Sequence, residues 1–251
     1  MTSNSLHSAE SVMHYTPEDI VQRAVDTLGG EILLDPASDA FGNATVCARN
    51  FYPREGLVRP WFGPLFVNPP GRSDDNPGGA SAWWHKLIAE WERASGSWSA
   101  IFVGFSLEIL QTCQSKGYRH PLRFPTCVPK QRIKFDVNAA VLRSSLVGKL
   151  EALKPKKCGV CKGSGIVAST WSEYASEPCE ACHMRELAYA AAAAPLNEKL
   201  AKIESAMKRG ERRYPGNSPT HGNFITCVTV DGGVQERFRA EFSPIGVVSG
   251  C

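Results

Sequence analysis

The chain has 251 residues, 43% hydrophobic and 21% charged, so it can bury the core of one domain, or of one domain with an insertion, and extended disorder is excluded as its main state. Its formal net charge is only +3, which by itself does not indicate a nucleic-acid partner. No apolar run approaches the roughly 20 residues that cross a bilayer, and the polar start resembles no signal peptide, so we expect a cytoplasmic protein without a membrane partner.

The first ordered element is expected near Tyr15, after a flexible leader over residues 1–14. Thr16 followed by Pro17 and two acidic residues is typical of a helix start, and an apolar stripe of helical period continues from there. Gly29-Gly30 predicts the end of this helix. A short buried strand is expected over 32–34, closed by Asp35 and Pro36.

Two further buried strands are predicted over 65–67 and 100–105, with an amphipathic helix over 81–94 between them. Alternation of apolar strands and helices predicts an α/β fold with a compact, largely parallel or mixed sheet. Ligands of such sheets bind beyond the carboxyl ends of the strands. Asp35, Asn68 and Phe105 fall at such ends, so we expect them near a ligand.

The second half of the chain predicts an inserted module over 136–217. Strands are expected over 132–135 and 223–228, and more than 80 residues between them are too many for a loop in a compact domain. The insertion has 13 Lys and Arg against 9 Asp and Glu, and the rest of the chain has 15 against 16, so the positive excess lies in the insertion. A helical run over 186–209 is expected, with Pro195 interrupting or restarting it.

The insertion also contains a cysteine pattern typical of zinc sites. Nine cysteines are present, and four of them form two CxxC pairs with 17 residues between the pairs. Each CxxC turn presents two sulfur atoms to one tetrahedral ion. In a reducing compartment this spacing predicts a zinc ion bound by Cys158, Cys161, Cys179 and Cys182. Lysines at 154, 156 and 157, just before the first pair, are either a solvated face or contacts to phosphate.

Asn68-Pro69-Pro70, directly after a buried strand, is the most pointed catalytic signal. The exocyclic amine of adenine or cytosine is a poor nucleophile because its lone pair is delocalised into the ring. An Asn side-chain oxygen and a rigidly held backbone carbonyl can accept both amine hydrogens and stabilise the charge that develops during attack. Proline pairs are also common in loops that have no catalytic role.

The order of several short motifs resembles the phage Dam-type DNA N6-adenine methyltransferases. The resemblance covers about 15–135 and 218–248, and its pieces are YTPEDI, LLDPAS with a later Asn, FYPREGL, FVNPP, a Trp-bearing helix, RIKF, SPTHGNFI and RF…F. It implies a Rossmann-like core that binds S-adenosylmethionine and acts on double-stranded DNA, inside a bacterial host. It implies that Asn68, Pro69 and Pro70 receive a flipped adenine. The implied cofactor pocket is formed by Tyr15, Thr16, Pro17, Asp35, Pro36 and Ala37.

Two departures from that family bear on the implied activity. The fourth residue of its catalytic motif is usually an aromatic that stacks on the flipped base, whereas this chain has Gly71, and Phe105, Trp83 or Trp84 are the candidate substitutes. The second departure is brevity: Asn68 follows Asp35 by only 33 positions, and no glycine-rich turn follows the first strand. The acid that would bind the cofactor ribose is therefore not indicated by a motif, and Asp39 and Glu55 are the candidates.

The sequence therefore predicts a DNA adenine-N6 methyltransferase whose core, 15–135 and 218–251, is split by a zinc-binding basic helical module. Two alternatives stay open. One is a non-catalytic zinc-bearing nucleic-acid-binding protein with a degenerate methyltransferase core. The other is a cytosine-N4 methyltransferase, because the same amine chemistry serves both bases. The oligomeric state is not predicted.

Overall fold

The computed structural model describes residues 14–72, 76–168, 176–216 and 222–250, so all but the last residue of the leader expected over 1–14, and part of the SPTHGNFI motif, lie outside it. The chain forms two compact units, one of residues 13–137 with 215–251 and one containing 138–214. The sequence placed the limits of the insertion at 136 and 217. No helix among the described residues is both long and apolar enough to cross a membrane.

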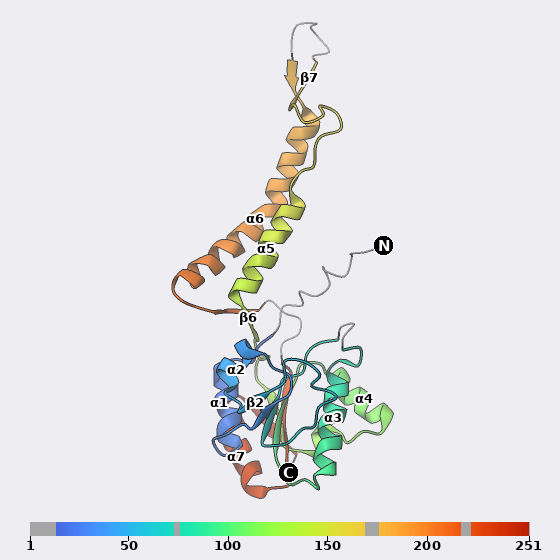
Figure 1. The fold of residues 1–251 in the computed structure, drawn as a ribbon, viewed down its shortest axis with the longest axis vertical. Coiled ribbons are helices and arrows are strands. Elements are labelled where there is room, and N and C mark those ends of the chain that lie inside the picture. Colours follow the sequence, from blue (N-terminus) through green and yellow to red (C-terminus); the bar gives the residue numbers. More distant parts are fainter. Residues whose placement is uncertain (1–13, 73–75, 169–175, 217–221, 251) are drawn as a thin grey trace. The chain divides into compact units, whose positions relative to one another are not determined.

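The first unit contains a seven-stranded mixed sheet (Figure 1). Its strands are β1 (Leu34–Asp35), β2 (Asn50–Phe51), β3 (Leu65–Val67), β4 (Ala100–Gly104), β5 (Thr126–Pro129), β10 (Phe224–Val228) and β11 (Gly246–Ser249). They lie in the order β11-β5-β10-β4-β3-β1-β2. Strands β1 to β4 are parallel, whereas β10 pairs antiparallel with both β4 and β5 and β11 pairs antiparallel with β5.

Helices cover both faces of this sheet, and the side chains of the strands alternate between them. Helices α1 (Glu18–Thr27) and α7 (Gly232–Phe242) lie on one face, and α3 (Gly79–Arg93) and α4 (Glu108–Lys116) lie on the other (Figure 1). Ile101 and Val103 of β4 pack toward α1 and α7, while Ala100 and Phe102 pack toward α3. This period of two fits a strand buried on both faces. The expected α/β fold with a mixed sheet is therefore present, with helices on both faces (Figure 1).

Local signals placed several elements well. Helix α1 ends at Thr27, and Gly29 and Gly30 follow with φ of 90° and 96°, the left-handed region that glycine adopts without strain. Strand β3 has the predicted bounds, and α3 begins two residues before the predicted helix. Strand β1 lies one residue later than predicted at its carboxyl end, because it includes Asp35. A short helix, α2 (Ala40–Val46), follows it.

The predicted strand over 132–135 is wrong. Only Ile133 forms an isolated antiparallel bridge, with Gly222, and the strand that enters the sheet is β5, which the sequence did not predict. Ile133 and Phe135 are buried in the same hydrophobic cluster as α1 and α7. The alternation of apolar and polar residues over 132–135 therefore reflects burial of these two side chains and not pairing in a continuous strand. The other predicted strand, β10, is present from Phe224.

The second unit is built on two helices that run side by side, α5 (Ala139–Leu153) and α6 (Glu180–Lys208) (Figure 1). Leu146 of α5 and Ile203 of α6 are buried in the cluster between them. The hairpin of β7 (Ile166–Ala168) and β8 (Ser176–Pro178) lies between these helices in the chain. Short strands β6 (Asp136–Asn138) and β9 (Arg213–Pro215) pair where the chain passes from one unit to the other.

Helix α6 continues through Pro195, so the predicted interruption is wrong. A proline inside a helix costs about 3 kcal/mol because it removes one hydrogen bond and crowds the preceding turn. Five consecutive alanines, which have the highest helix propensity, precede Pro195. Leu196, Leu200 and Ile203 then pack against α5. Propensity and packing together outweigh the cost of the proline.

Candidate functional site

The first candidate site lies at the carboxyl edge of the parallel strands. Strand register places Leu34 level with Leu65, and Val67 level with Phe102. Since β1, β3 and β4 run in the same direction, the residues that follow them reach the same edge of the sheet. Asp35, Asn68 and Phe105 therefore share this edge, as their places after buried strands indicated.

The side chain of Asn68 is held by a hydrogen bond that fixes its orientation. Its Nδ2 donates to the backbone oxygen of His14 at 3.1 Å. No described residue donates a hydrogen bond to Asn68 Oδ1 or to the carbonyl oxygen of Pro69. The next residue, Pro70, has no backbone N–H. Two acceptors at adjacent residues, the half-buried Asn68 and the buried Pro69, are therefore left without a hydrogen-bond partner among the described residues.

Asn76 holds the turn that follows Asn68, a role the sequence did not reveal. Its Nδ2 donates to the carbonyl oxygens of Pro70 at 3.1 Å and of Gly71 at 3.0 Å. The side chain is only 6% exposed, and its Oδ1 is buried without a hydrogen-bond partner. Asn76 lies in a stretch rich in Gly, Asp and Pro, which by composition predicts only a connecting loop. The turn is thus fixed by a side chain five residues away.

Asp35 is buried at the end of β1, with 3% of its surface exposed. Its Oδ1 accepts a hydrogen bond from the Ala37 backbone N–H at 3.1 Å. Burial raises the pKa of this carboxyl to about 7, against the smaller opposite effect of the hydrogen bonds from Ala37 and Ser38. Below neutral pH, Asp35 therefore keeps its proton and shapes the loop of Pro36 and Ala37.

Tyr15 connects the candidate cofactor segments. Its hydroxyl donates to Asp39 Oδ2 at 2.9 Å, and its ring lies 4.9 Å from that of Phe41. Asp39 Oδ1 in turn accepts from Gly42 N at 2.7 Å and caps α2. Neighbouring His14 is the residue that holds Asn68. The segment of Tyr15, Thr16 and Pro17 is thus brought beside both the Asn68 turn and the loop after Asp35.

The two acids suggested for the cofactor ribose have structural partners. Asp39 is engaged by Tyr15 and by the α2 backbone. Glu55 is exposed and forms an ion pair with Arg59 at 3.3 Å. Neither residue therefore offers a buried carboxylate without a partner, which is what binding of a ribose hydroxyl would need.

Two buried polar atoms near the edge lack partners among the described residues. Trp83 Nε1 is a donor, and Asn76 Oδ1 is an acceptor. Gly56 lies between the Trp83 ring and the carbonyl oxygen of Pro36. A Cβ added at Gly56 would lie 2.5 Å from the ring and 2.1 Å from the carbonyl oxygen. Only glycine permits this approach. Both atoms are shielded from solvent, so each is a polar group that a buried partner would satisfy.

The position of the missing aromatic is open. Gly71 is exposed, and a Cβ added there would have no atom of the described residues within 4 Å. Trp84 is fully buried and Trp83 is 6% exposed, so both serve as core residues, whereas Phe105 is only partly buried. Of the three suggested substitutes, Phe105 alone retains an accessible surface at the strand end.

The second candidate site is the group of four cysteines in the second unit. The sulfur atoms of Cys158, Cys161, Cys179 and Cys182 lie within 4.8 Å of one another and could hold a metal ion such as zinc. Cys158 Sγ lies 3.8 Å from Cys179 Sγ, and Cys161 Sγ lies 3.3 Å from Cys182 Sγ. Zinc–sulfur bonds of about 2.3 Å in a tetrahedron separate the sulfurs by about 3.8 Å. The donor set and spacing fit a four-thiolate site.

Local structure brings these cysteines together. The first pair lies in a turn before β7, where Lys162 and Gly163 adopt φ of 55° and 96°. Cys179 follows β8 as the residue before α6, and Cys182 lies in the first turn of that helix. The backbone N–H of Cys179 donates to Gly165 O at 2.9 Å and ties the two pairs together. Helix N-termini favour thiolates, which metal binding requires.

Hydrogen bonds within the group favour thiolates at the first CxxC pair. N–H groups of Cys161 and Val160 lower the pKa of Cys158. The Cys182 thiol, followed by the backbone of Gly165 and Gly163, lowers the pKa of Cys161 to about 6. Donation to Cys161 raises the pKa of Cys182 to about 12. Negative charge is thus favoured at Cys158 and Cys161 over Cys182.

The remaining described cysteines have no metal spacing. Cys113, Cys127 and Cys227 are buried in the first unit, and Cys47 is exposed. Burial raises the pKa of Cys113 and of Cys127 to about 11, and it raises that of Cys227 further. These three are therefore neutral core thiols. Cys251 lies outside the described residues.

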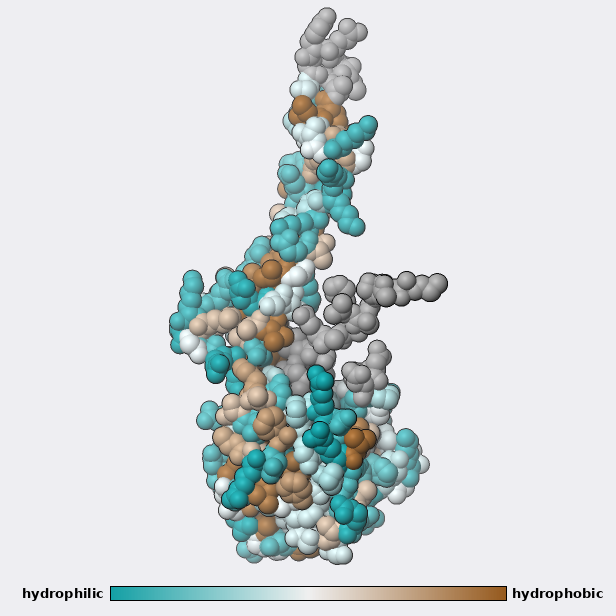
Figure 2. Space-filling view, viewed as in Figure 1, coloured by the Kyte–Doolittle hydropathy of each residue, from teal (hydrophilic) through white to brown (hydrophobic). Residues whose placement is uncertain are grey.

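The surface near the metal group combines basic and apolar side chains. Lys156 and Lys157 are exposed and form no ion pair with any described residue, whereas Lys154 pairs with Glu151 at 2.7 Å. Val160 and Met184 are 68% and 58% exposed. Brown apolar residues accordingly appear among polar ones at the end of the unit that carries β7 (Figure 2). Two of the three lysines named from the sequence are thus available to an anionic partner.

Comparison with known proteins gives no family for this chain. No protein-family model matches it, and no curated protein or solved structure matches it significantly.

Proposed function

We propose that this protein transfers a methyl group from S-adenosylmethionine to an exocyclic amine in DNA, with the N6 amine of adenine as the target. The observation that carries the proposal is the pair of open acceptors, Asn68 Oδ1 and Pro69 O, at the carboxyl edge of the parallel strands. An amine with two hydrogens matches such a pair. Accepting both hydrogens keeps electron density on the nitrogen and stabilises the positive charge that develops there.

The arrangement of the sheet supports the proposal. Strand β10 lies between β4 and β5 and is antiparallel to both, whereas β1, β3 and β4 are parallel. The candidate residues lie at the edge where such α/β sheets bind ligands.

Residues of the first unit would hold the cofactor and the base in separate roles. Tyr15, Asp35 and the loop of Pro36 and Ala37 would line the cofactor pocket, with Trp83 Nε1 as a buried donor. S-adenosylmethionine supplies an electrophilic methyl group when bound. His14 O orients the amide of Asn68, and Asn76 fixes the turn, so both acceptors are preorganised and need no rearrangement when charge develops.

The second unit would hold DNA through its basic surface. A metal ion bound by the four cysteines would fix the turn that precedes β7 and the start of α6. Lys156 and Lys157 lie just before Cys158 and would contact backbone phosphates, which position a duplex without reading its sequence.

Transfer of tritiated methyl from S-adenosylmethionine to unmethylated DNA, followed by digestion to nucleosides, tests the proposal. Label in N6-methyladenine is expected, and label in N4-methylcytosine would instead assign the cytosine reaction. Asn68→Ala should abolish transfer and keep DNA affinity. Asn76→Ala should lower the rate of transfer. Asn76→Asp should lower it as much, because at neutral pH a carboxylate cannot donate the two hydrogen bonds that Asn76 gives to Pro70 and Gly71. Absence of label with folded, metal-loaded protein would refute the proposal.

A non-catalytic nucleic-acid-binding protein is the second candidate. One observation favours it: Gly71 offers no stacking surface. Calorimetry with S-adenosylmethionine separates the two functions, because only the enzyme requires the cofactor. Binding that weakens in Asp35→Ala supports the methyltransferase, and DNA binding without cofactor binding supports the alternative.

A further inference from the structure

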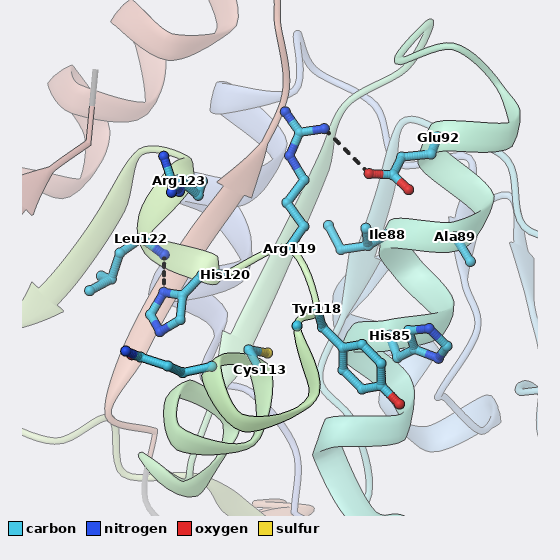
Figure 3. A pocket seen from close by; sticks show the side chains of 12 residues that line it. His85, Ile88, Ala89, Glu92, Cys113, Tyr118, Arg119, His120, Leu122 and Arg123 are labelled. Carbon is cyan, nitrogen blue, oxygen red and sulfur yellow. Dashed lines mark hydrogen bonds and ion pairs between the residues drawn. The ribbon is translucent and has the colours of Figure 1, made fainter.

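The first unit has a groove that the proposed chemistry does not use. It lies between α3, α4 and the segment 117–123, which contains the short helix η1 (Pro121–Arg123), and it has a volume of about 1100 Å³ (Figure 3). Helix α3 starts after the Asn68 turn and leads back to the opposite edge of the sheet, where β4 begins. The groove is lined by the middle and end of α3 and by the end of α4. It is therefore displaced toward the amino edge, away from Asn68.

Arg119 is held in this groove by three neighbours. Its guanidinium carbon lies 5.1 Å from the ring centres of both Trp91 and Phe124, and its Nη1 lies 3.4 Å from Glu92 Oε1. Figure 3 shows Arg119 and Glu92 joined on one side of the groove. A guanidinium fixed by rings loses little conformational entropy when it binds a ligand.

The facing wall adds further donors. His120 Nδ1 accepts a hydrogen bond from Leu122 N at 3.2 Å, so the neutral ring carries its hydrogen on Nε2. Arg123 is exposed and forms no ion pair with any described residue. His85 and Tyr118 stack with ring centres 4.1 Å apart at an angle of 17° and present a flat aromatic pair beside the cations.

Donors outnumber acceptors along the lining. Arg119, Arg123 and His120 offer N–H groups, and Glu92 is the one carboxylate among the lining residues. A ligand with excess acceptor oxygens would restore the balance, and guanidinium groups pair with phosphate through two parallel hydrogen bonds. The stacked rings suit a planar base.

We propose that this groove binds a phosphate ester that carries a planar base, that is, a nucleotide. The shared chemistry permits two sources, a free nucleotide and the backbone of a nucleic-acid strand. The inference does not depend on methyl transfer, because its readout is binding alone. Failure of the transfer assay therefore leaves it untouched, and probe binding that Arg123→Ala does not weaken would overturn it while leaving the methyltransferase proposal untouched.

Calorimetry with AMP and with inorganic phosphate, beside fluorescence titration of a short DNA duplex, tests the proposal. Arg123→Ala should weaken binding of the true ligand by about tenfold, the effect of one charge-assisted hydrogen bond. Thermal unfolding should stay unchanged, because Arg123 is exposed. Arg54→Ala removes another exposed arginine of the same unit, outside the groove, and is the matched control.

Each outcome decides the matter. Tighter binding of AMP than of phosphate, weakened only by Arg123→Ala, supports a free nucleotide. Duplex binding weakened only by that variant, with no heat from AMP, supports a nucleic-acid backbone. Equal losses in the Arg54 and Arg123 variants would overturn the proposal, as would the absence of binding of every probe to the parent protein.

Discussion

Gly71 offers the sharpest test of the catalytic edge, because an aromatic side chain can be added there without disturbing the fold. The residue is exposed, no atom of the part of the chain that the structure describes lies within 4 Å of an added Cβ, and its φ is not in the left-handed region. Its carbonyl stays bonded to Asn76 whatever side chain it carries. Gly71→Tyr should therefore fold normally.

The expected effect of Gly71→Tyr follows from base stacking. The Dam-type resemblance implies that an aromatic at this position stacks on the flipped base, and such stacking contributes about 1–3 kcal/mol. If the same contact forms in the transition state, kcat/KM for methyl transfer should rise about five- to a hundred-fold. The parent protein should be the slower enzyme, because its base is held by the acceptors of Asn68 and Pro69 alone.

The assay is steady-state transfer of tritiated methyl to unmethylated DNA, with two control variants. Gly71→Ala measures the effect of losing glycine, and Gly71→Leu measures added bulk without a π surface. Only the tyrosine variant should gain. Equal rates for Gly71→Tyr and Gly71→Leu would show that no base stacks at this position, and the assignment of the flipped base to the Asn68 turn would then be wrong.

Three further outcomes are expected. Purified protein should contain about one zinc per chain. The double variant Cys158→Ser with Cys179→Ser should lose the metal, and the start of α6 should loosen first. Metal analysis that finds no zinc in protein purified without chelator would contradict this prediction. Burial raises the pKa of Asp35 from 3.8 to about 7, so between these values the folded state holds a proton that the unfolded chain has released. The free energy of unfolding should therefore fall as pH rises through this window, by about 1.4 kcal/mol per pH unit. Urea unfolding should show this slope in the parent and a flatter profile in Asp35→Asn, and identical profiles would refute it. Replacing Lys156 and Lys157 with Ala should weaken DNA binding and lower the logarithmic salt slope by about 0.9 per lost phosphate contact; an unchanged slope in gel-shift titrations would show that these lysines are only solvated.

Much of the fold could be predicted because its signals are local. Helix α1 ends where two glycines permit positive φ, and β3 and β4 are runs of apolar residues. The four cysteines are spaced so that each pair forms its own turn. The place of Asn68 at a strand end also followed from its immediate neighbours. In each case the residues that decide the structure lie within a few positions of one another.

Other features depended on partners that are distant in the chain. Strand β5 exists because β10 and β11 pair with it, about a hundred residues later, whereas 132–135 looks as apolar but finds only one bridge. Helix α6 continues through Pro195 because α5 packs against it.

The open acceptors at Asn68 and Pro69 were likewise decided by tertiary structure. His14 and Asn76 hold them in place, and neither residue carries a sequence signal for that role. The sequence by itself determined which residues could accept hydrogen bonds from an amine and which could bind a metal. Only the folded chain decided which of their hydrogen-bonding groups remain available, because that depends on donors supplied by other segments.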